Sequence, residues 1–202
     1  DGRIAIVTGA NIGLGLHTAL ELAGKGCKVV LACRNLDKAA AAKAEILQQH
    51  PKAKVECLQL DLSSLKSVRD FAAKFTAKYK RLDLLINNAG IMMPPFSLSE
   101  DGFESQLAAN YLGHFALTGL LLPLLEQTAG SRIVSLSSLA HNWSSMRFDD
   151  LQFSKGYNKR KAYGQSKFAC LMFAYELNRR LQKAGSKTLS VAAHPGVSAT
   201  NL

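Results

Sequence analysis

The chain has 202 residues, 48% of them hydrophobic and 20% charged, which is the composition of an ordinary globular protein. This length predicts one domain with a substantial buried core. Lysine and arginine number 25 against 15 aspartates and glutamates, so the net charge is +10 and suits an anionic partner. The basic residues gather only in short clusters, at 78–81 and 155–161, which favour solvated surface over a nucleic-acid interface.

The cysteines argue against a metal-binding protein, and the apolar stretches argue against a membrane-spanning one. The four cysteines form no Cys-x-x-Cys pair and have no histidine-rich neighbourhood, so no metal site is expected. Their apolar neighbours indicate buried free thiols in a reducing compartment, and a cytoplasmic location is expected. The longest apolar stretch, 115–125, falls short of the roughly 20 residues that span a bilayer. Membrane association or targeting would therefore need segments outside this chain.

Apolar strand-like runs alternate with helical patterns along the whole chain. Most runs are continuous Val, Ile, Leu and Ala stretches, as expected for parallel strands that are covered on both faces. The order predicts an α/β fold, with a doubly wound, Rossmann-type parallel sheet flanked by helices on both faces, in one domain over 1–202. The predicted strands are Ile4–Thr8, Lys28–Cys33, Lys54–Gln59, Leu82–Asn87, Arg132–Leu136 and Leu189–Ala193, and the predicted helices are 14–25, 37–50, 64–79, 101–125 and 163–183.

Two segments depart from this regular alternation. The connection over 140–162 is long for a compact domain and rich in polar and aromatic residues, so it is expected to be functional or disordered. The chain also reaches Leu202 shortly after the last predicted strand. We expect that strand to be an exposed apolar edge, which globular proteins normally cover, and the natural protein to be longer.

A glycine-rich segment, Thr8-Gly9-Ala10-Asn11-Ile12-Gly13-Leu14-Gly15, connects the first predicted strand to the first predicted helix. Glycines there permit a tight turn and a close approach of the backbone to a diphosphate, and the helix N-terminus adds N–H donors. The spacing Gly-x-x-x-Gly-x-Gly differs from the general Gly-x-Gly-x-x-Gly fingerprint. Its place between a strand and a helix nevertheless favours a dinucleotide site over a plain turn.

The end of the second predicted strand indicates which dinucleotide would bind. In NAD-binding sites of this kind an acidic residue, about twenty residues after the loop, holds the ribose 2′-hydroxyl. Cys33 takes that place here, followed by Arg34 and, a turn later, Lys38. Arginine suits a phosphate through bidentate, charge-assisted hydrogen bonds. We therefore expect NADP(H) rather than NAD(H), the alternative being that Arg34 is an ordinary surface arginine.

These motifs and several others resemble the short-chain dehydrogenase/reductase family over the whole chain. The stretches "LACRN", "NNAGIMM" and "VSLSSLAH" narrow the resemblance to its retinol-dehydrogenase-like branch, which includes the oxidoreductase domain of a WW-domain protein. The family has a substrate lid and a last strand after the position of Thr200, and we expect both to be missing here. With Arg34 and Lys38, the expected cofactor-binding residues are Gly9, Asn11, Ile12, Gly13, Leu14, Gly15, Asp61, Leu62, Asn88, Ala89, Gly90, Tyr163, Lys167, Pro195, Gly196, Val197 and Thr200.

The resemblance also implies a catalytic tetrad of Asn110, Ser138, Tyr163 and Lys167. Hydride transfer to a carbonyl leaves an alkoxide that needs a proton, which Tyr163 can donate. Lys167 shares its helical face, so we expect its charge to lower the phenol pKa from the usual value of about 10. Ser138, or alternatively Ser137, is suited to hydrogen-bond the carbonyl oxygen. The family role of Asn110 is to hold a water that relays protons from Lys167.

The expected function is that of an NADP(H)-dependent oxidoreductase that interconverts a carbonyl and an alcohol. The branch resemblance implies an apolar aldehyde or ketone, such as a retinoid-like or steroid-like compound, and no nucleic acid as partner. A homo-oligomer is compatible with the sequence. Two alternatives are a non-catalytic nucleotide-binding regulator on the same fold and, from the net charge alone, a nucleic-acid binder.

Overall fold

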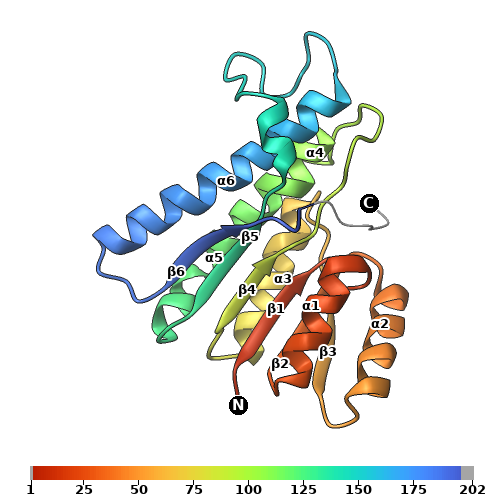
Figure 1. The fold of residues 1–202 in the computed structure, drawn as a ribbon, viewed down its shortest axis with the longest axis vertical. Helices are drawn as coiled ribbons and strands as arrows, with labels where there is room; N and C mark the ends of the chain where they lie inside the picture. Colours follow the sequence, from red (N-terminus) through yellow and green to blue (C-terminus); the bar gives the residue numbers. More distant parts are fainter. Residues whose placement is uncertain (1, 197–202) are drawn as a thin grey trace.

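Six parallel strands form one sheet at the centre of the structure, a computed structural model that describes residues 2–196 (Figure 1). The strand bounds are β1 Ile4–Thr8, β2 Lys28–Cys33, β3 Lys54–Gln59, β4 Leu84–Asn87, β5 Arg132–Leu136 and β6 Leu189–Ala193. Their order in the sheet is β3-β2-β1-β4-β5-β6, so the direction of winding reverses between β1 and β4. Such a reversal opens a crevice at the carboxyl ends of the strands. The chain therefore has the predicted doubly wound, Rossmann-type fold.

The predicted strands are confirmed, except that β4 begins at Leu84 rather than at Leu82. The N–H of Leu82 donates to the Thr128 hydroxyl (3.1 Å) and not to a backbone carbonyl of a neighbouring strand. The Asp83 carboxylate accepts the N–H of Ile4 (2.8 Å). Both residues therefore fasten the base of the sheet, and the regular pairing of β4 starts after them.

Helices cover both faces of the sheet, as predicted (Figure 1). Their bounds are α1 Gly13–Gly24, α2 Leu36–Gln49, α3 Leu65–Lys78, α4 Ser105–Leu107, a π-helical turn η1 Ala108–Leu112, α5 Gly113–Gln127, a 3₁₀ turn η2 Leu139–Trp143 and α6 Lys159–Lys183. α1 and α2 pack on one face and bury Val7 and Leu31, whereas α3 and α5 pack on the other and bury Ile6 and Val30. Consecutive strand residues point to opposite faces, so the continuous apolar runs supply both layers of the core.

The helix expected over 101–125 starts later and is irregular. Residues 98–104 form a turn closed by an antiparallel bridge, so the helix begins at Ser105. The π-helical turn at Ala108–Leu112 interrupts it before it continues as α5. Such turns often occur at functional sites.

This helix is also longer than the apolar stretch in the sequence indicated. From Ser105 to Gln127 it has 23 residues, and among the described helices it alone is long and apolar enough to cross a membrane. The expectation that no stretch reaches that length is therefore wrong for this helix. Half of its most apolar window is buried inside the structure. Its apolar side chains pack with α3 against the sheet, as those of a core helix do.

The long connection over 140–162 is structured at both ends. It contains most of the turn η2 and leads directly into the start of α6. α6 begins at Lys159, because the Asn158 side chain caps it by accepting the N–H of Lys161 (3.0 Å). Tyr163, expected at the start of this helix, consequently lies in its second turn.

β6 lies at the edge of the sheet and pairs, among the described strands, with β5 alone. It leaves the side chains of Leu189 and Val191 exposed, at 37% and 42% of their full accessible area. The expected exposed apolar edge is thus present, and edge strands of this kind expose unpaired backbone N–H and C=O groups.

Candidate active site

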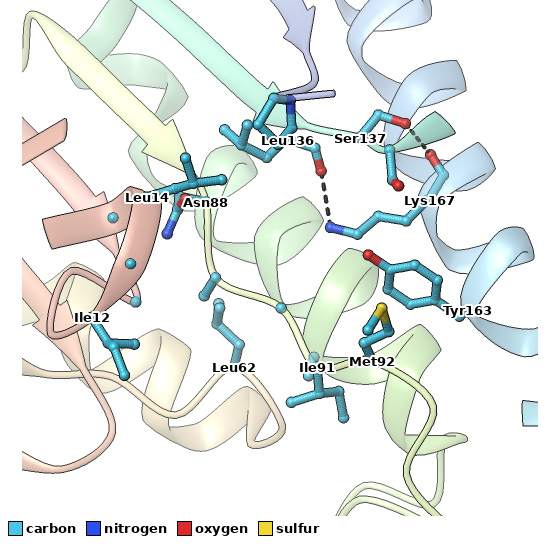
Figure 2. A pocket seen from close by; sticks show the side chains of 18 of the residues that line it. Ile12, Leu14, Leu62, Asn88, Ile91, Met92, Leu136, Ser137, Tyr163 and Lys167 are labelled. Atoms are coloured by element: carbon cyan, nitrogen blue, oxygen red, sulfur yellow. Dashed lines mark hydrogen bonds between the residues drawn. The ribbon is translucent and has the colours of Figure 1, made fainter. Parts of the chain in front are cut away.

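A cavity of about 610 Å³ opens at the carboxyl ends of the strands, where the order of the sheet reverses (Figure 2). This is the usual ligand site of an open α/β sheet. Lys38 does not line it, although its neighbour Arg34 does, and Val197 and Thr200 lie outside the described residues. The predicted cofactor residues that line it are Gly9, Asn11, Ile12, Gly13, Leu14, Gly15, Arg34, Asp61, Leu62, Asn88, Ala89, Gly90, Tyr163, Lys167, Pro195 and Gly196.

The glycine-rich loop is compact because two glycines adopt backbone angles that other residues avoid. Gly9 and Gly13 have φ values of +63° and +55°, in the left-handed region. The first turn of α1 packs so closely on the loop that a Cβ on Gly15 would lie 2.3 Å from the carbonyl oxygen of Gly9. The N-cap residue, Ile12, has no side-chain acceptor for the free N–H groups of the helix. Those groups are left to bind an anion in the cavity.

Thr8, the last residue of β1, ties the loop to the turn that follows β4. Its hydroxyl accepts the N–H groups of Asn88 (2.9 Å) and Ala89 (3.0 Å). The Asn88 amide in turn donates to the carbonyl oxygen of Thr8 (2.8 Å). The two cofactor-binding segments predicted from sequence are therefore held together by three hydrogen bonds.

Arg34 lies directly after β2, with an exposed side chain at the edge of the cavity. The next residue, Asn35, caps α2 by accepting the N–H of Lys38 (2.8 Å), which places Lys38 in the first turn of that helix. Arg34 is thus in a position to reach a phosphate bound at this end of the cavity. Lys38 is not part of the cavity lining, and its positive charge lies in the first turn of α2, four residues after Arg34.

Tyr163 and Lys167 project from α6 into the cavity, and Figure 2 shows the phenol oxygen and the amine directed to the same side. The Lys167 ammonium lies 5.8 Å from the centre of the Tyr163 ring and donates to the carbonyl oxygen of Leu136 (3.2 Å). Burial raises the pKa of Tyr163, and the hydrogen bond from Ser138 opposes that rise only in part. Burial also lowers the pKa of Lys167.

The expected lowering of the Tyr163 pKa by Lys167 is therefore not found. Desolvation disfavours the charged forms of both side chains, and the ammonium is directed to a backbone carbonyl as well as toward the ring. The phenol consequently keeps its proton across the neutral range, which is the form that a general acid needs.

The two serines that follow β5 have different hydrogen-bond partners. The Ser137 hydroxyl donates to the carbonyl oxygen of Lys167 (2.8 Å) and fastens α6 to the strand (Figure 2). The Ser138 hydroxyl accepts the N–H of Ala140 (3.1 Å) and interacts with the phenol of Tyr163. Of the two serines, Ser138 is therefore the one whose hydroxyl interacts with the phenol of Tyr163.

Asn110 lies in the π-helical turn and is buried beside the cavity instead of lining it. Its amide oxygen accepts the N–H of Ile91 (2.8 Å), and its amide nitrogen donates to the Ile91 carbonyl (3.0 Å). The same nitrogen donates to the hydroxyl of Ser166 (2.9 Å), which donates to the carbonyl of Tyr163 (2.8 Å). The side chain thus positions the cavity wall and α6, and the water relay remains a prediction.

Sequence reasoning missed the apolar wall that faces Tyr163. The side chains of Ile91, Met92, Leu139 and Trp143 line this part of the cavity. The Trp143 ring lies 6.2 Å from that of Tyr163. The run "GIMM" after the β4 turn was a signal for the first two residues, but Leu139 and Trp143 are brought here by the fold of η2.

The sheet order, the cavity at its carboxyl edge and the Ser–Tyr–Lys cluster beside a glycine-rich loop define a Rossmann-type α/β protein with an oxidoreductase-like site. The short chain dehydrogenase family matches residues 3–202. The chain belongs to this family.

Relatives of known sequence or structure agree with that assignment. Human retinol dehydrogenase 13 is 50% identical over 202 residues, which are 100% of this chain and 60% of the relative, so the chain spans about 60% of the length of such relatives. A crystal structure of an uncharacterized protein from Mycobacterium Paratuberculosis has a TM-score of 0.87 and 47% identity, over 99% of this chain and 70% of that one. A Shigella flexneri short chain dehydrogenase complexed with NADP has a TM-score of 0.79 and 26% identity, over 98% and 79%.

Proposed function

We propose that this chain carries out NADP(H)-dependent interconversion of a carbonyl and an alcohol. The observation that carries the proposal is the buried phenol of Tyr163, accompanied by the Ser138 hydroxyl and the Lys167 ammonium, in the cavity beside the glycine-rich loop. The loop fits a dinucleotide, because it lines the cavity together with the first turn of α1, whose N–H groups have no side-chain cap and can bind a diphosphate. Bound there, the nicotinamide cofactor would supply the hydride.

The residues of this chain have distinct roles in the proposed reduction. Ser138 would donate a hydrogen bond to the substrate carbonyl oxygen and hold it against the phenol. Tyr163 would then transfer its proton to that oxygen as the new C–H bond forms. Lys167, whose ammonium lies on the same face of α6, would offset part of the negative charge left on the phenolate, but less than the burial that raises the pKa of Tyr163. In the oxidation direction the same proton returns to Tyr163.

We further propose an apolar aldehyde or ketone as substrate, of retinoid-like or steroid-like character. The apolar side chains of Ile91, Met92, Leu139 and Trp143 support this class, since they offer a substrate no charge and few hydrogen-bond partners. The name of the human relative, retinol dehydrogenase 13, points in the same direction. A cytoplasmic location and a homo-oligomeric state remain predictions from the sequence.

The direct test is a panel of aldehydes and ketones incubated with NADPH and the full-length protein, with oxidation of NADPH as the readout. Apolar carbonyls should be reduced faster than small polar ones. A cofactor that binds tightly but is oxidised with no carbonyl of the panel would favour the non-catalytic regulator instead.

Arg34→Ala should weaken binding of NADPH by about tenfold or more and leave binding of NADH nearly unchanged. A charge-assisted hydrogen bond contributes about 1.5–3 kcal/mol, which corresponds to such a factor. Titration calorimetry with both cofactors measures the two affinities. Arg69→Ala, which removes an exposed arginine of α3 outside the cavity lining, is the matched control. An unchanged ratio of the two affinities in Arg34→Ala would contradict the assignment.

Trp143→Ala should lower kcat/KM for bulky apolar carbonyls by about tenfold and affect small carbonyls little, because a large apolar contact is lost. The Arg160 guanidinium packs on the indole, with its central carbon 4.4 Å from the ring centre, and this contact favours the ring position that lines the cavity. Phe148→Ala, which removes a more exposed aromatic side chain of the same connection, is the control. An equal loss of kcat/KM for large and small substrates would argue against a contact between Trp143 and the substrate.

A further inference from the structure

His114 is a buried histidine between the two cofactor-binding turns and the π-helical turn, and the proposed chemistry does not use it. Its Nδ1 lies 2.9 Å from the carbonyl oxygen of Asn110. Its Nε2 lies 2.9 Å from the hydroxyl oxygen of Thr8. The imidazole therefore bridges the end of β1 and the turn that carries Asn110.

The partners of the ring determine where its proton lies. A backbone carbonyl only accepts hydrogen bonds, so Nδ1 must carry the proton that is donated to Asn110. Burial and, to a smaller extent, the charge of Lys167 together lower the pKa of His114 to about 4, although the bond to the Asn110 carbonyl opposes this. The ring is therefore neutral near pH 7, and Nε2 accepts the proton of the Thr8 hydroxyl.

The other hydrogen bonds of the Thr8 hydroxyl show that it is the donor in its contact with His114. It already accepts the N–H groups of Asn88 and Ala89, so its own proton is free to be donated. The Ile86 carbonyl, at 3.3 Å, is a longer alternative acceptor than His114 at 2.9 Å. Donors and acceptors thus form one chain from the β4 turn, through Thr8 and the imidazole, to the Asn110 carbonyl.

The chain continues from Asn110 to the candidate catalytic residues. The Asn110 side chain holds the backbone of Ile91, a wall of the cavity, and reaches the Tyr163 carbonyl through the hydroxyl of Ser166. The thiol of Cys170 on α6 donates to the same Asn110 carbonyl as His114 does (3.2 Å). A shift of the π-helical turn would therefore move both the cavity wall and α6.

We propose that His114 is a positioning residue, which in its neutral, Nδ1-protonated form fixes the π-helical turn relative to the cofactor-binding turns and so places Tyr163. This inference rests on the proposed carbonyl chemistry for its effect on turnover. Its structural part, the state of the imidazole, can be tested without any substrate.

The first test is the ¹⁵N NMR spectrum of the histidine rings in the full-length protein. His114 should show a protonated Nδ1 and an unprotonated Nε2, and should not titrate between about pH 5 and pH 8, where an ordinary histidine does. The titratable groups around it among the described residues are Lys167 and the Cys170 thiol. A proton on Nε2, or a normal titration of His114, would overturn the proposal.

The second test compares turnover and cofactor binding in three variants. His114→Phe keeps a ring but removes both hydrogen bonds, and kcat should fall about tenfold, since misplacement by about 1 Å can cost a factor of about 100. The dissociation constant for NADPH should change less than about threefold, because Asn88 still holds the Thr8 carbonyl. His114→Asn, whose amide can still donate to the Asn110 carbonyl, should recover part of the lost turnover.

Leu117→Ala is the control for a loss of stability alone, since Leu117 is fully buried in the apolar core one turn further along α5 and its side chain has no group that can form a hydrogen bond. It should lower the unfolding temperature while kcat of the folded protein stays near wild type. If His114→Phe behaves in the same way, the role of His114 is merely structural and the proposal is wrong. If wild type reduces no carbonyl, the proposed function fails, and the NMR result still decides the state of His114.

Discussion

Tyr163→Phe removes a single hydroxyl and is expected to reduce carbonyl turnover by at least about 10²–10⁴-fold, the usual contribution of general acid catalysis. The ring is buried and packs against Trp143, and those contacts do not involve the oxygen. The fold and the affinity for NADPH should therefore survive. Single-turnover kinetics, with the affinity measured in parallel, would separate the chemical step from binding.

The matched control is Tyr175→Phe, which removes the same hydroxyl from an exposed position on the same helix. It should leave turnover unchanged. Near-normal turnover in Tyr163→Phe, with bound NADPH and a folded protein, would rule out Tyr163 as the proton donor.

The pH dependence follows from the direction of the Tyr163 pKa. Because burial raises that pKa above its ordinary value of about 10, the phenol stays protonated across the neutral range. The rate of carbonyl reduction should therefore be flat through neutral pH and fall only as the pH rises through the raised pKa. Alcohol oxidation, which needs the phenolate, should instead rise toward alkaline pH. An alkaline decline of the reduction rate that begins near pH 7 would mean that Lys167 lowers the pKa after all.

Most of the fold was predictable because the strands are encoded by continuous apolar runs between helical patterns. Such runs fit a parallel sheet covered on both faces and few other structures. The start of β4 was misplaced because Leu82 continues the apolar run, whereas its N–H is taken by the Thr128 hydroxyl. The π-helical turn at Ala108–Leu112 was not predictable, since its widened backbone depends on partners that lie far away in the sequence.

The cofactor loop and the Tyr–Lys pair were predictable from local spacing, since each lies within one short segment. How deeply the fold buries this pair was not predictable. Whether the pKa of Tyr163 rises or falls depends on how completely the fold buries it, and the i, i+4 spacing to Lys167 carries no information on burial. His114 was passed over for the same reason. In the sequence it is one polar residue in an apolar helix, and its two partners lie on β1 and in the π-helical turn.

The other large effect is expected at Gly15, where even one added methyl group should abolish tight binding of the cofactor. A Cβ there would lie 2.3 Å from the Gly9 carbonyl oxygen and 2.5 Å from the Asn88 amide nitrogen. Atoms do not approach so closely, so α1, the loop or the Asn88 turn must move apart. Each of these movements displaces backbone groups that line the cavity.

The Gly15→Ala variant should consequently bind NADPH about 100-fold more weakly, the scale of a misplacement by about 1 Å. Overpacking of this kind also costs about 1–3 kcal/mol of folding free energy. Gly119→Ala is the matched control, because a Cβ on this glycine of α5 meets no described atom within 4 Å. It should stabilise the protein by about 0.5–1 kcal/mol, the helical preference of alanine over glycine. Calorimetric NADPH affinities and unfolding curves measure both effects, and a Gly15→Ala protein that binds NADPH as wild type does would show that the loop is not the cofactor cradle.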